Sequence, residues 1–309
     1  MGTPEFAVES LKALMDAGHD IAAVVTMPDK PAGRGQKTSQ SAVKTFAVEH
    51  GLKVLQPEKL KDPAFVGELR SLGADLQVVV AFRMLPEIVW NMPRYGSVNL
   101  HASLLPQYRG AAPINWAIIN GETHTGVTTF RLKHEIDTGD IMMQRSIDIL
   151  PDDNAGTIHD KLMTIGGEMI AETVRRIEAG EIETVSQDMT DDGRLRTAPK
   201  IFKADCRIDW TRTAEQIHNL VRGLSPYPAA WSTLHDANGN ELAVKVFATQ
   251  TDTRRIDCGR IETDGKTYLR VGCADGSIAI REIQLPGKKR MDVRQFLQGF
   301  HFADNAKFD

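Results

Sequence analysis

The stretch Leu76-Gln77-Val78-Val79-Val80-Ala81-Phe82 predicts the architecture of the first part of the chain. Its apolar residues follow one another with little alternation, which is typical of a strand covered on both faces of a parallel sheet. A second apolar run spans Ile21–Thr26, and helical spacing of apolar residues is found over Val8–Ala17 and Ala155–Ala179. Short buried strands that alternate with helices predict an open α/β sheet.

The pattern changes after residues 187–203, a polar stretch with Gly and Pro that we interpret as a linker between a domain over 1–186 and a second domain over 204–309. One helix is expected near Thr213–Arg222. Short β-type runs are expected at Ala243–Ala248, Thr267–Val271 and Ser277–Ile283, with turn signals at Asn238-Gly239 and Asp264-Gly265. Short strands joined by such turns predict a small β-barrel.

Length and composition favour a soluble chain with two cores: 309 residues, 41% hydrophobic and 25% charged. No run approaches the roughly 18 apolar residues that cross a bilayer, and no basic-then-apolar leader opens the sequence, so we expect a cytoplasmic protein without a membrane partner. The cysteines are Cys206, Cys258 and Cys273. They lack Cys-x-x-Cys spacing, which argues against a disulfide framework or a zinc site, and we predict no bound metal.

Charge is distributed unevenly along the chain. Residues 200–309 hold 17 Lys/Arg against 14 Asp/Glu, a net of +3, whereas residues 1–199 hold 20 against 27, a net of −7. A mildly basic second part is compatible with a phosphate-bearing partner, but it is too weak a signal to identify one. We interpret Trp210, Tyr227 and Trp231 as core-packing residues rather than as stacking platforms for bases.

Polar side chains that suit carbonyl chemistry follow the apolar runs. Asn99 and His101 are two residues apart at the end of a short run, so extended backbone would point both side chains the same way. An amide and an imidazole can together stabilise negative charge that develops on a carbonyl oxygen. Asp137 and Asp140 flank a Thr-Gly pair further along. Taken singly, each motif is also explained as a strand end or a turn.

Four segments together resemble the catalytic signature of the folate-dependent formyltransferases: His101–Pro106, Tyr108–Ile114, Gly126–Thr128 and Asp137–Asp140. The resemblance implies a Rossmann-like formyltransferase domain and 10-formyltetrahydrofolate as co-substrate. It also implies Asn99, His101 and Asp137 as the catalytic residues. The folate-contacting segment would be Ser103, Leu104, Leu105 and Pro106, with Phe82 to Leu85 as a further wall.

Within that superfamily, three features resemble the methionyl-tRNA formyltransferase family: Gly2–Ala7, the loop Pro28–Gly35 and a C-terminal domain of about 105 residues. This resemblance covers nearly the whole chain. It implies an oligonucleotide-binding (OB)-like second domain, initiator methionyl-tRNA as acceptor, and a monomer. The implied tRNA-binding residues are Lys30, Arg34 and Lys37 in the loop and Lys288, Lys289 and Arg290 in the second domain.

Alternatives share parts of this pattern. A formyltransferase acting on a sugar nucleotide or another small amine would use the same three catalytic residues, and a non-catalytic tRNA- or folate-binding module would keep only the fold. A hydride-transferring enzyme is disfavoured because no Gly-x-Gly-x-x-Gly follows a strand. Since the resembled family has an apolar strand before Gly2, we also expect the natural protein to start upstream, with Met1 as an internal methionine.

Overall fold

A computed structural model describes residues 1–32, 37–187, 195–235, 240–303 and 306–309. Two compact units are distinguished by their internal packing. The N-terminal unit comprises Met1–Gly110, Thr125–Ile147 and His159–Thr197, and the C-terminal unit comprises Ala111–His124, Asp148–Ile158 and Ala198–Asp309. Each unit is assembled from three segments, and the contiguous domain limits 1–186 and 204–309 stay a prediction.

The first two thirds of the chain alternate helices and short strands, as the apolar runs predict. The helices are α1 (Glu5–Asp16), α2 (Ala42–Glu49), α3 (Pro63–Ser71), α4 (Glu87–Trp90), α5 (Pro113–Ile119) and α6 (Ala155–Ala179). The strands are β1 (Val24–Val25), β2 (Lys30–Ala32), β3 (Lys37–Ser39), β4 (Val54–Leu55), β5 (Gln77–Val80), β6 (Ser97–His101), β7 (Arg109–Gly110), β8 (His124–Arg131), β9 (Ile141–Asp148) and β10 (Thr197–Ala198).

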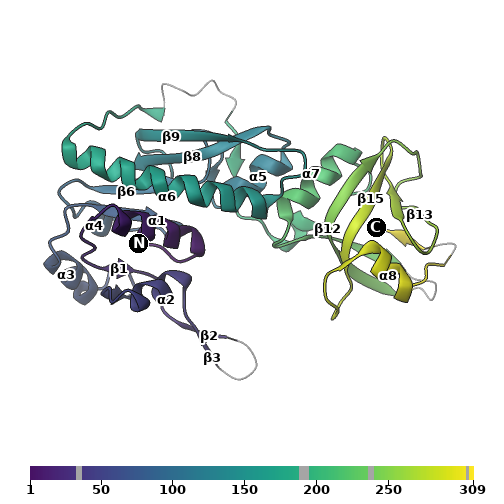
Figure 1. Ribbon diagram of the computed structural model, residues 1–309, viewed down its shortest axis with the longest axis horizontal. Helices are drawn as coiled ribbons and strands as arrows, with labels where there is room; N and C mark the ends of the chain where they lie inside the picture. The colour runs from purple at the N-terminus through teal and green to yellow at the C-terminus, as the bar shows by residue number, and fades with distance from the viewer. Residues whose placement is uncertain (33–36, 188–194, 236–239, 304–305) are drawn as a thin grey trace. The chain divides into compact units, whose positions relative to one another are not determined.

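The main sheet of the N-terminal unit has the strand order β5-β6-β8-β9, of which β6, β8 and β9 are labelled in Figure 1. Strand β5 runs parallel to β6, and β8 pairs with β6 in the antiparallel sense. Helix α6 packs along this sheet, where Thr173 and Thr129 share a buried hydrogen bond of 3.0 Å. The Rossmann-like α/β architecture is therefore confirmed, with a mixed rather than wholly parallel sheet. His101 is the last residue of β6, so its side chain lies at the edge where such sheets place ligands.

Polar residues at helix starts explain where several helices begin. The Ser41 side chain accepts a hydrogen bond from the N–H of Lys44 in α2, and Asp62 accepts one from the N–H of Ala64 in α3. Thr213 caps α7 (Ala214–Leu224) in the same manner. These side chains satisfy N–H groups that a helix leaves without partners in its first turn.

A cavity of about 340 Å³ lies between β1 and β5 in the N-terminal unit. Gly2 pairs with Val80 beside it and donates its N–H to the carbonyl of Val25. Ser10 and His19 line the cavity, and each keeps one buried polar atom without a hydrogen-bond partner among the described residues. The additional strand expected from the resemblance stays a prediction.

The C-terminal unit is mainly one curved antiparallel sheet. Besides α5 and the first residues of α6, its elements are η2 (Lys203–Cys206), α7 (Ala214–Leu224), β11 (Ala230–His235), β12 (Glu241–Asp252), β13 (Ile261–Thr263), β14 (Leu269–Gly272), β15 (Ser277–Gln284), β16 (Met291–Asp292), α8 (Val293–Gly299) and β17 (Lys307–Phe308). The strand order is β13-β14-β15-β12-β11-β17, with β16 paired to β15. A bridge between Arg260 and Lys307 nearly closes the sheet, as expected for the predicted barrel.

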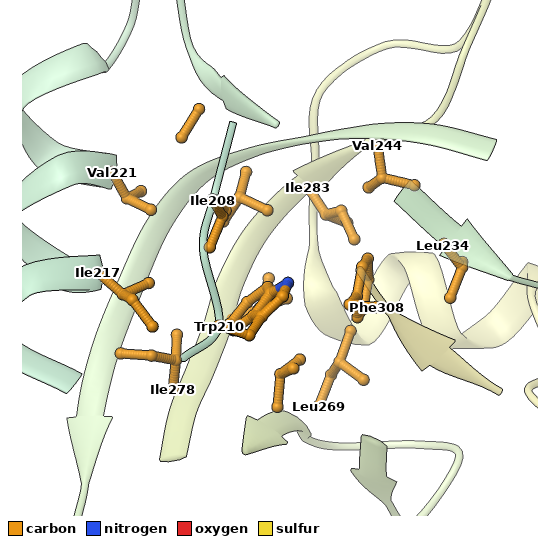
Figure 2. Close-up of a cluster of buried hydrophobic side chains, with 14 of the residues drawn as sticks. Ile208, Trp210, Ile217, Val221, Leu234, Val244, Leu269, Ile278, Ile283 and Phe308 are labelled. Carbon is orange, nitrogen blue, oxygen red and sulfur yellow. The ribbon is translucent and has the colours of Figure 1, made fainter. Parts of the chain in front are cut away.

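Trp210 lies at the centre of the core of this unit (Figure 2). Its side chain is 4% exposed, its indole N–H donates to Ser232, and its ring lies 5.7 Å from that of Phe308. The core-packing interpretation is confirmed for Trp210. It is wrong for Tyr227, which is 82% exposed between two cis X-Pro bonds. Trp231 is half-buried and donates its indole N–H to a backbone carbonyl.

Shortening Ile217 to valine should destabilise this core modestly. Ile217 is 1% exposed on α7, and removing one buried methylene costs about 0.5–1.5 kcal/mol because the surrounding side chains relax only partly. Urea unfolding followed by circular dichroism measures the change. The matched variant Ile88→Val removes the same group from a side chain that is 52% exposed, and it should change stability by less than about 0.5 kcal/mol. Equal losses of stability in the two variants would contradict the burial of Ile217 in this core.

Candidate functional site

The His101 imidazole is held in one orientation at the end of β6. Its side chain is 7% exposed, and its Nε2 lies 2.9 Å from the backbone carbonyl of Tyr108. Because a carbonyl oxygen only accepts, Nε2 must carry the hydrogen and donate it. The other ring nitrogen, Nδ1, faces Asp137 Oδ2 at 3.8 Å. Nδ1 is thus the nitrogen that can meet a reacting group.

Asp137 approaches His101 from the turn between β8 and β9. Its side chain is 14% exposed, and Oδ2 also accepts a hydrogen bond of 3.0 Å from the backbone N–H of Gly110. The residue has a φ of 54°, in the left-handed region that few residues other than glycine occupy. Strained backbone of this kind persists where the surroundings hold it, and it is common at functional sites.

Asn99 precedes His101 by two positions on the same strand, so the pleat directs both side chains to one face. It is half-buried, and its backbone is paired with Val79 on β5 and Phe130 on β8. Within the described part of the chain its amide makes no side-chain hydrogen bond. The strand therefore places an uncommitted N–H donor on the same face as the imidazole, and Asp137 lies beside that imidazole.

The predicted folate segment, Ser103 to Pro106, has mostly buried side chains. Ser103 is fully buried and donates its hydroxyl to the Gln107 carbonyl, and Leu105 is 3% exposed. Leu104 is the half-buried member of the segment. A ligand here would therefore meet the main chain and Leu104 before the other side chains.

Two residues that sequence reasoning did not assign hold this segment in place. The Thr128 hydroxyl donates to the Ser103 carbonyl at 2.7 Å and accepts from the N–H of Leu105 at 3.1 Å. The Gln144 side chain donates to the Leu105 carbonyl at 2.8 Å and to Thr128 at 2.9 Å. Thr128 belongs to the Gly126–Thr128 motif, whereas Gln144 is one polar residue within a strand and carries no signal in sequence.

The segment after β5 presents a large apolar side chain to solvent. Met84 is 72% exposed, Phe82 is half-buried, and Leu85 is buried. The guanidinium of Arg83 donates to the carbonyls of Glu58 and Pro57, which fixes the path of the segment. An exposed apolar residue just after a strand end is compatible with the wall predicted over Phe82 to Leu85.

The loop that follows β1 has an anchored base. Strands β2 and β3 form a hairpin in which Lys30 pairs with Ser39 and Ala32 with Lys37. Lys30 is exposed, and Arg34 lies outside the described residues. At the base, Asp29 accepts hydrogen bonds from Lys44 Nζ at 2.5 Å and Gln56 Nε2 at 2.7 Å, and both lower the pKa of Asp29.

The three residues of the predicted basic cluster in the C-terminal unit differ in their contacts. Lys288 and Lys289 are exposed on the turn that follows Pro286-Gly287. Arg290 donates to the Glu282 carboxylate at 2.6 Å, and its guanidinium lies 4.7 Å from the centre of the Phe247 ring. Arg290 is exposed as well, but its charge is partly neutralised by Glu282.

Neither a group of metal ligands nor a membrane-spanning helix is found among the residues that the structure describes. No group of three or more His, Cys, Asp or Glu side chains is arranged there to hold a metal ion. Among the same residues, none of the helices combines the length and the apolar character needed to cross a bilayer.

Comparison with known proteins identifies a family for both parts of the chain. Residues 1–174 match the formyl transferase family, and residues 200–301 match the formyl transferase C-terminal domain. The methionyl-tRNA formyltransferase of Bacteroides fragilis is 54% identical over 310 residues, covering 99% of this chain and 96% of that protein. The methionyl-tRNA formyltransferase of Phocaeicola vulgatus is 56% identical over 314 residues, covering 100% and 97%.

Solved structures share the fold at lower identity. The sugar 3N-formyl transferase WlaRD, solved with dTDP and 5-N-formyl-THF, has a TM-score of 0.66 at 21% identity, covering 93% of this chain and 97% of that chain. An N-formyltransferase from Helicobacter canadensis, in complex with folinic acid and dTDP-3-aminofucose, has a TM-score of 0.64 at 20% identity, covering 90% and 96%.

Proposed function

The chain belongs to the formyl transferase family, and from this premise we propose that it formylates the methionine carried by initiator tRNA. The formyl donor is 10-formyltetrahydrofolate, used as a co-substrate. One observation carries the chemical part of the proposal: His101 Nδ1 and the Asp137 carboxylate lie 3.8 Å apart, and the Asn99 amide is on the same face of β6 as His101. A proton acceptor and two possible hydrogen-bond donors are the groups that acyl transfer to an amine requires.

In the reaction that we propose, the methionyl amine attacks the formyl carbon, and a tetrahedral adduct forms. The Asn99 amide and the protonated Nδ1 of His101 donate to the oxygen on which negative charge develops. Asp137 accepts the proton that the amine loses. The adduct collapses by breaking the bond between the formyl carbon and the folate nitrogen, and that nitrogen takes up the proton held by Asp137 as it leaves.

The acceptor is inferred from the curated relatives and the basic residues. Relatives at 48–56% identity over nearly the whole chain are methionyl-tRNA formyltransferases. We place the tRNA contacts at Lys30, Arg34 and Lys37 of the loop and at Lys288, Lys289 and Arg290 of the C-terminal unit. Cationic side chains bind phosphates without reading sequence, so these residues would position the acceptor rather than choose it. We also propose that the enzyme works as a cytoplasmic monomer.

The decisive test offers the purified protein one formyl donor and three acceptors. We expect formylmethionine from 10-formyltetrahydrofolate and methionyl initiator tRNA, and little product from an amino sugar nucleotide or glycinamide ribonucleotide. Transfer to the sugar nucleotide alone would replace the proposed acceptor. Binding of folate and tRNA without transfer to any amine would instead support a non-catalytic module.

Replacing Lys288 and Lys289 together by alanine should weaken tRNA binding and make the remaining binding less dependent on salt concentration. Each lysine that neutralises a phosphate contributes about one unit to the slope of log Kd against log salt, so the double variant should lower that slope by about two. Titration of labelled tRNA at several salt concentrations measures the slope. Lys266→Ala, which removes an exposed lysine from a different turn of the same unit, should leave the slope unchanged. An unchanged slope in the double variant would remove these lysines from the interface.

A further inference from the structure

Gln187 occupies a position between two parts of the catalytic signature. Its side chain is 1% exposed, although the surrounding sequence is polar. Its Nε2 donates to the backbone carbonyls of Asp137 at 2.9 Å and Gly139 at 2.7 Å. Its Oε1 accepts two hydrogen bonds from the Arg109 guanidinium, at 3.0 Å from Nε and 2.7 Å from Nη2. One buried amide thus connects the Asp137 turn to the segment that contains Arg109.

Backbone pairing explains how a residue from this segment reaches the turn. Val185 and Ile141 form an antiparallel bridge, with N–H to carbonyl distances of 2.8 and 2.9 Å in the two directions. In antiparallel pairing, moving two residues forward on one chain corresponds to moving two residues back on the other. Gln187 is therefore directed toward Gly139 and can donate to the two carbonyls of the turn.

The Nε2 and the Oε1 of Gln187 both help to position the Asp137 carboxylate. The Asp137 carbonyl is held directly, and Asp137 itself has the unusual φ of 54°. Arg109 is followed at once by Gly110, whose N–H donates to Asp137 Oδ2. The amide therefore fixes the backbone of Asp137 from one side and the donor to its carboxylate from the other.

We propose that Gln187 is a positioning residue for formyl transfer: it holds the strained Asp137 turn so that the carboxylate faces His101 Nδ1. This role rests on the proposed function. Glutamine suits the position because its amide offers two N–H donors and an oxygen with two acceptor sites. A glutamate carboxylate has nearly the same shape but only accepts hydrogen bonds. It would therefore keep the contact with the Arg109 guanidinium but place an oxygen against the carbonyl oxygens of Asp137 and Gly139.

The test compares Gln187→Glu with Gln187→Met, which keeps the length of the side chain without its hydrogen bonds. Both variants should lower kcat at least tenfold, while KM for the folate donor and for methionyl-tRNA changes less than about threefold. Gln77→Glu is the matched control, because it introduces a carboxylate at a position that is 7% exposed on β5, outside the assigned machinery. The control should lose stability without the selective fall in kcat. Wild-type kcat in both Gln187 variants, with the fold intact, would overturn the role.

A double-mutant cycle separates positioning of Asp137 from a general structural effect. If Gln187 acts through Asp137, adding Gln187→Glu to Asp137→Asn should lower kcat little further, because interacting residues are not additive. Multiplicative losses in the double variant would mean that Gln187 acts independently of Asp137 and would overturn the proposal. Activity of the wild-type protein toward methionyl-tRNA tests the proposed function separately, since it does not depend on either variant.

Discussion

Replacing His101 by alanine is expected to lower kcat for formyl transfer by about 10²–10³-fold, the usual cost of removing one donor to a developing oxyanion. The buried ring presents only Nδ1 to the reacting group because Nε2 is bound to the Tyr108 carbonyl. Truncation therefore removes the donor and leaves no other ring nitrogen to replace it. Steady-state rates with saturating folate donor and methionyl-tRNA measure the change in kcat.

The control for His101→Ala must account for the hydrogen bond to the Tyr108 carbonyl, which the variant loses. A hydrogen bond of this kind contributes about 0.5–1.5 kcal/mol, so the variant should unfold at a lower temperature even though it still folds. His134→Ala removes an exposed imidazole near the Asp137 turn and should change neither kcat nor stability. Folate binding by the His101 variant should persist. A turnover number equal to that of the wild type would remove His101 from the catalytic residues.

Replacing Asp137 by asparagine should lower kcat by about 10²–10⁴-fold, the range typical for loss of a general base. Asparagine preserves the shape and can still accept from the Gly110 N–H, but it cannot take the proton that the attacking amine must lose. Single-turnover rates with both substrates prebound would separate this chemical effect from any effect on binding.

Asp140 provides the matched control within the same turn. It lies three residues from Asp137, and its carboxylate accepts a hydrogen bond of 2.7 Å from the half-exposed Lys133. Asp140→Asn should therefore keep kcat within a factor of a few of the wild type and change stability by less than about 1 kcal/mol, because exposed ion pairs contribute little. If both variants lost activity equally, the turn as a whole would matter and Asp137 would have no special role.

The loop after β1 and the basic cluster of the C-terminal unit show how much of a binding surface can be predicted from residue types alone. The glycines, prolines and cations of Pro28–Gly35 predict a shaped basic loop, and the structure adds the Asp29 contacts that anchor its base. For Lys288 to Arg290, the sequence predicts one basic cluster. All three residues are exposed, but the structure pairs Arg290 with Glu282, because the pairing of β15 with β16 brings Glu282 close to Arg290.

Local patterns determined the elements and the chemistry of this protein. Helix α6 runs over Ala155–Ala179 as its spacing predicts, and β5 lies within the apolar run 76–82, because both depend on interactions among near neighbours. Asn99, His101 and Asp137 were singled out because their segments resemble the formyltransferase signature, and their catalytic roles stay a prediction.

Only the tertiary structure decided which atoms of those residues face one another. The orientation of the His101 ring depends on a carbonyl seven residues away, and the Asp137 turn is held by Gln187, fifty residues further on. In sequence Gln187 belongs to a polar stretch that reads as a linker, whereas in the fold it is 1% exposed. Hydrogen bonds between distant segments are directional and leave no periodic signal in the chain, so residues that position the catalytic groups emerge only after folding.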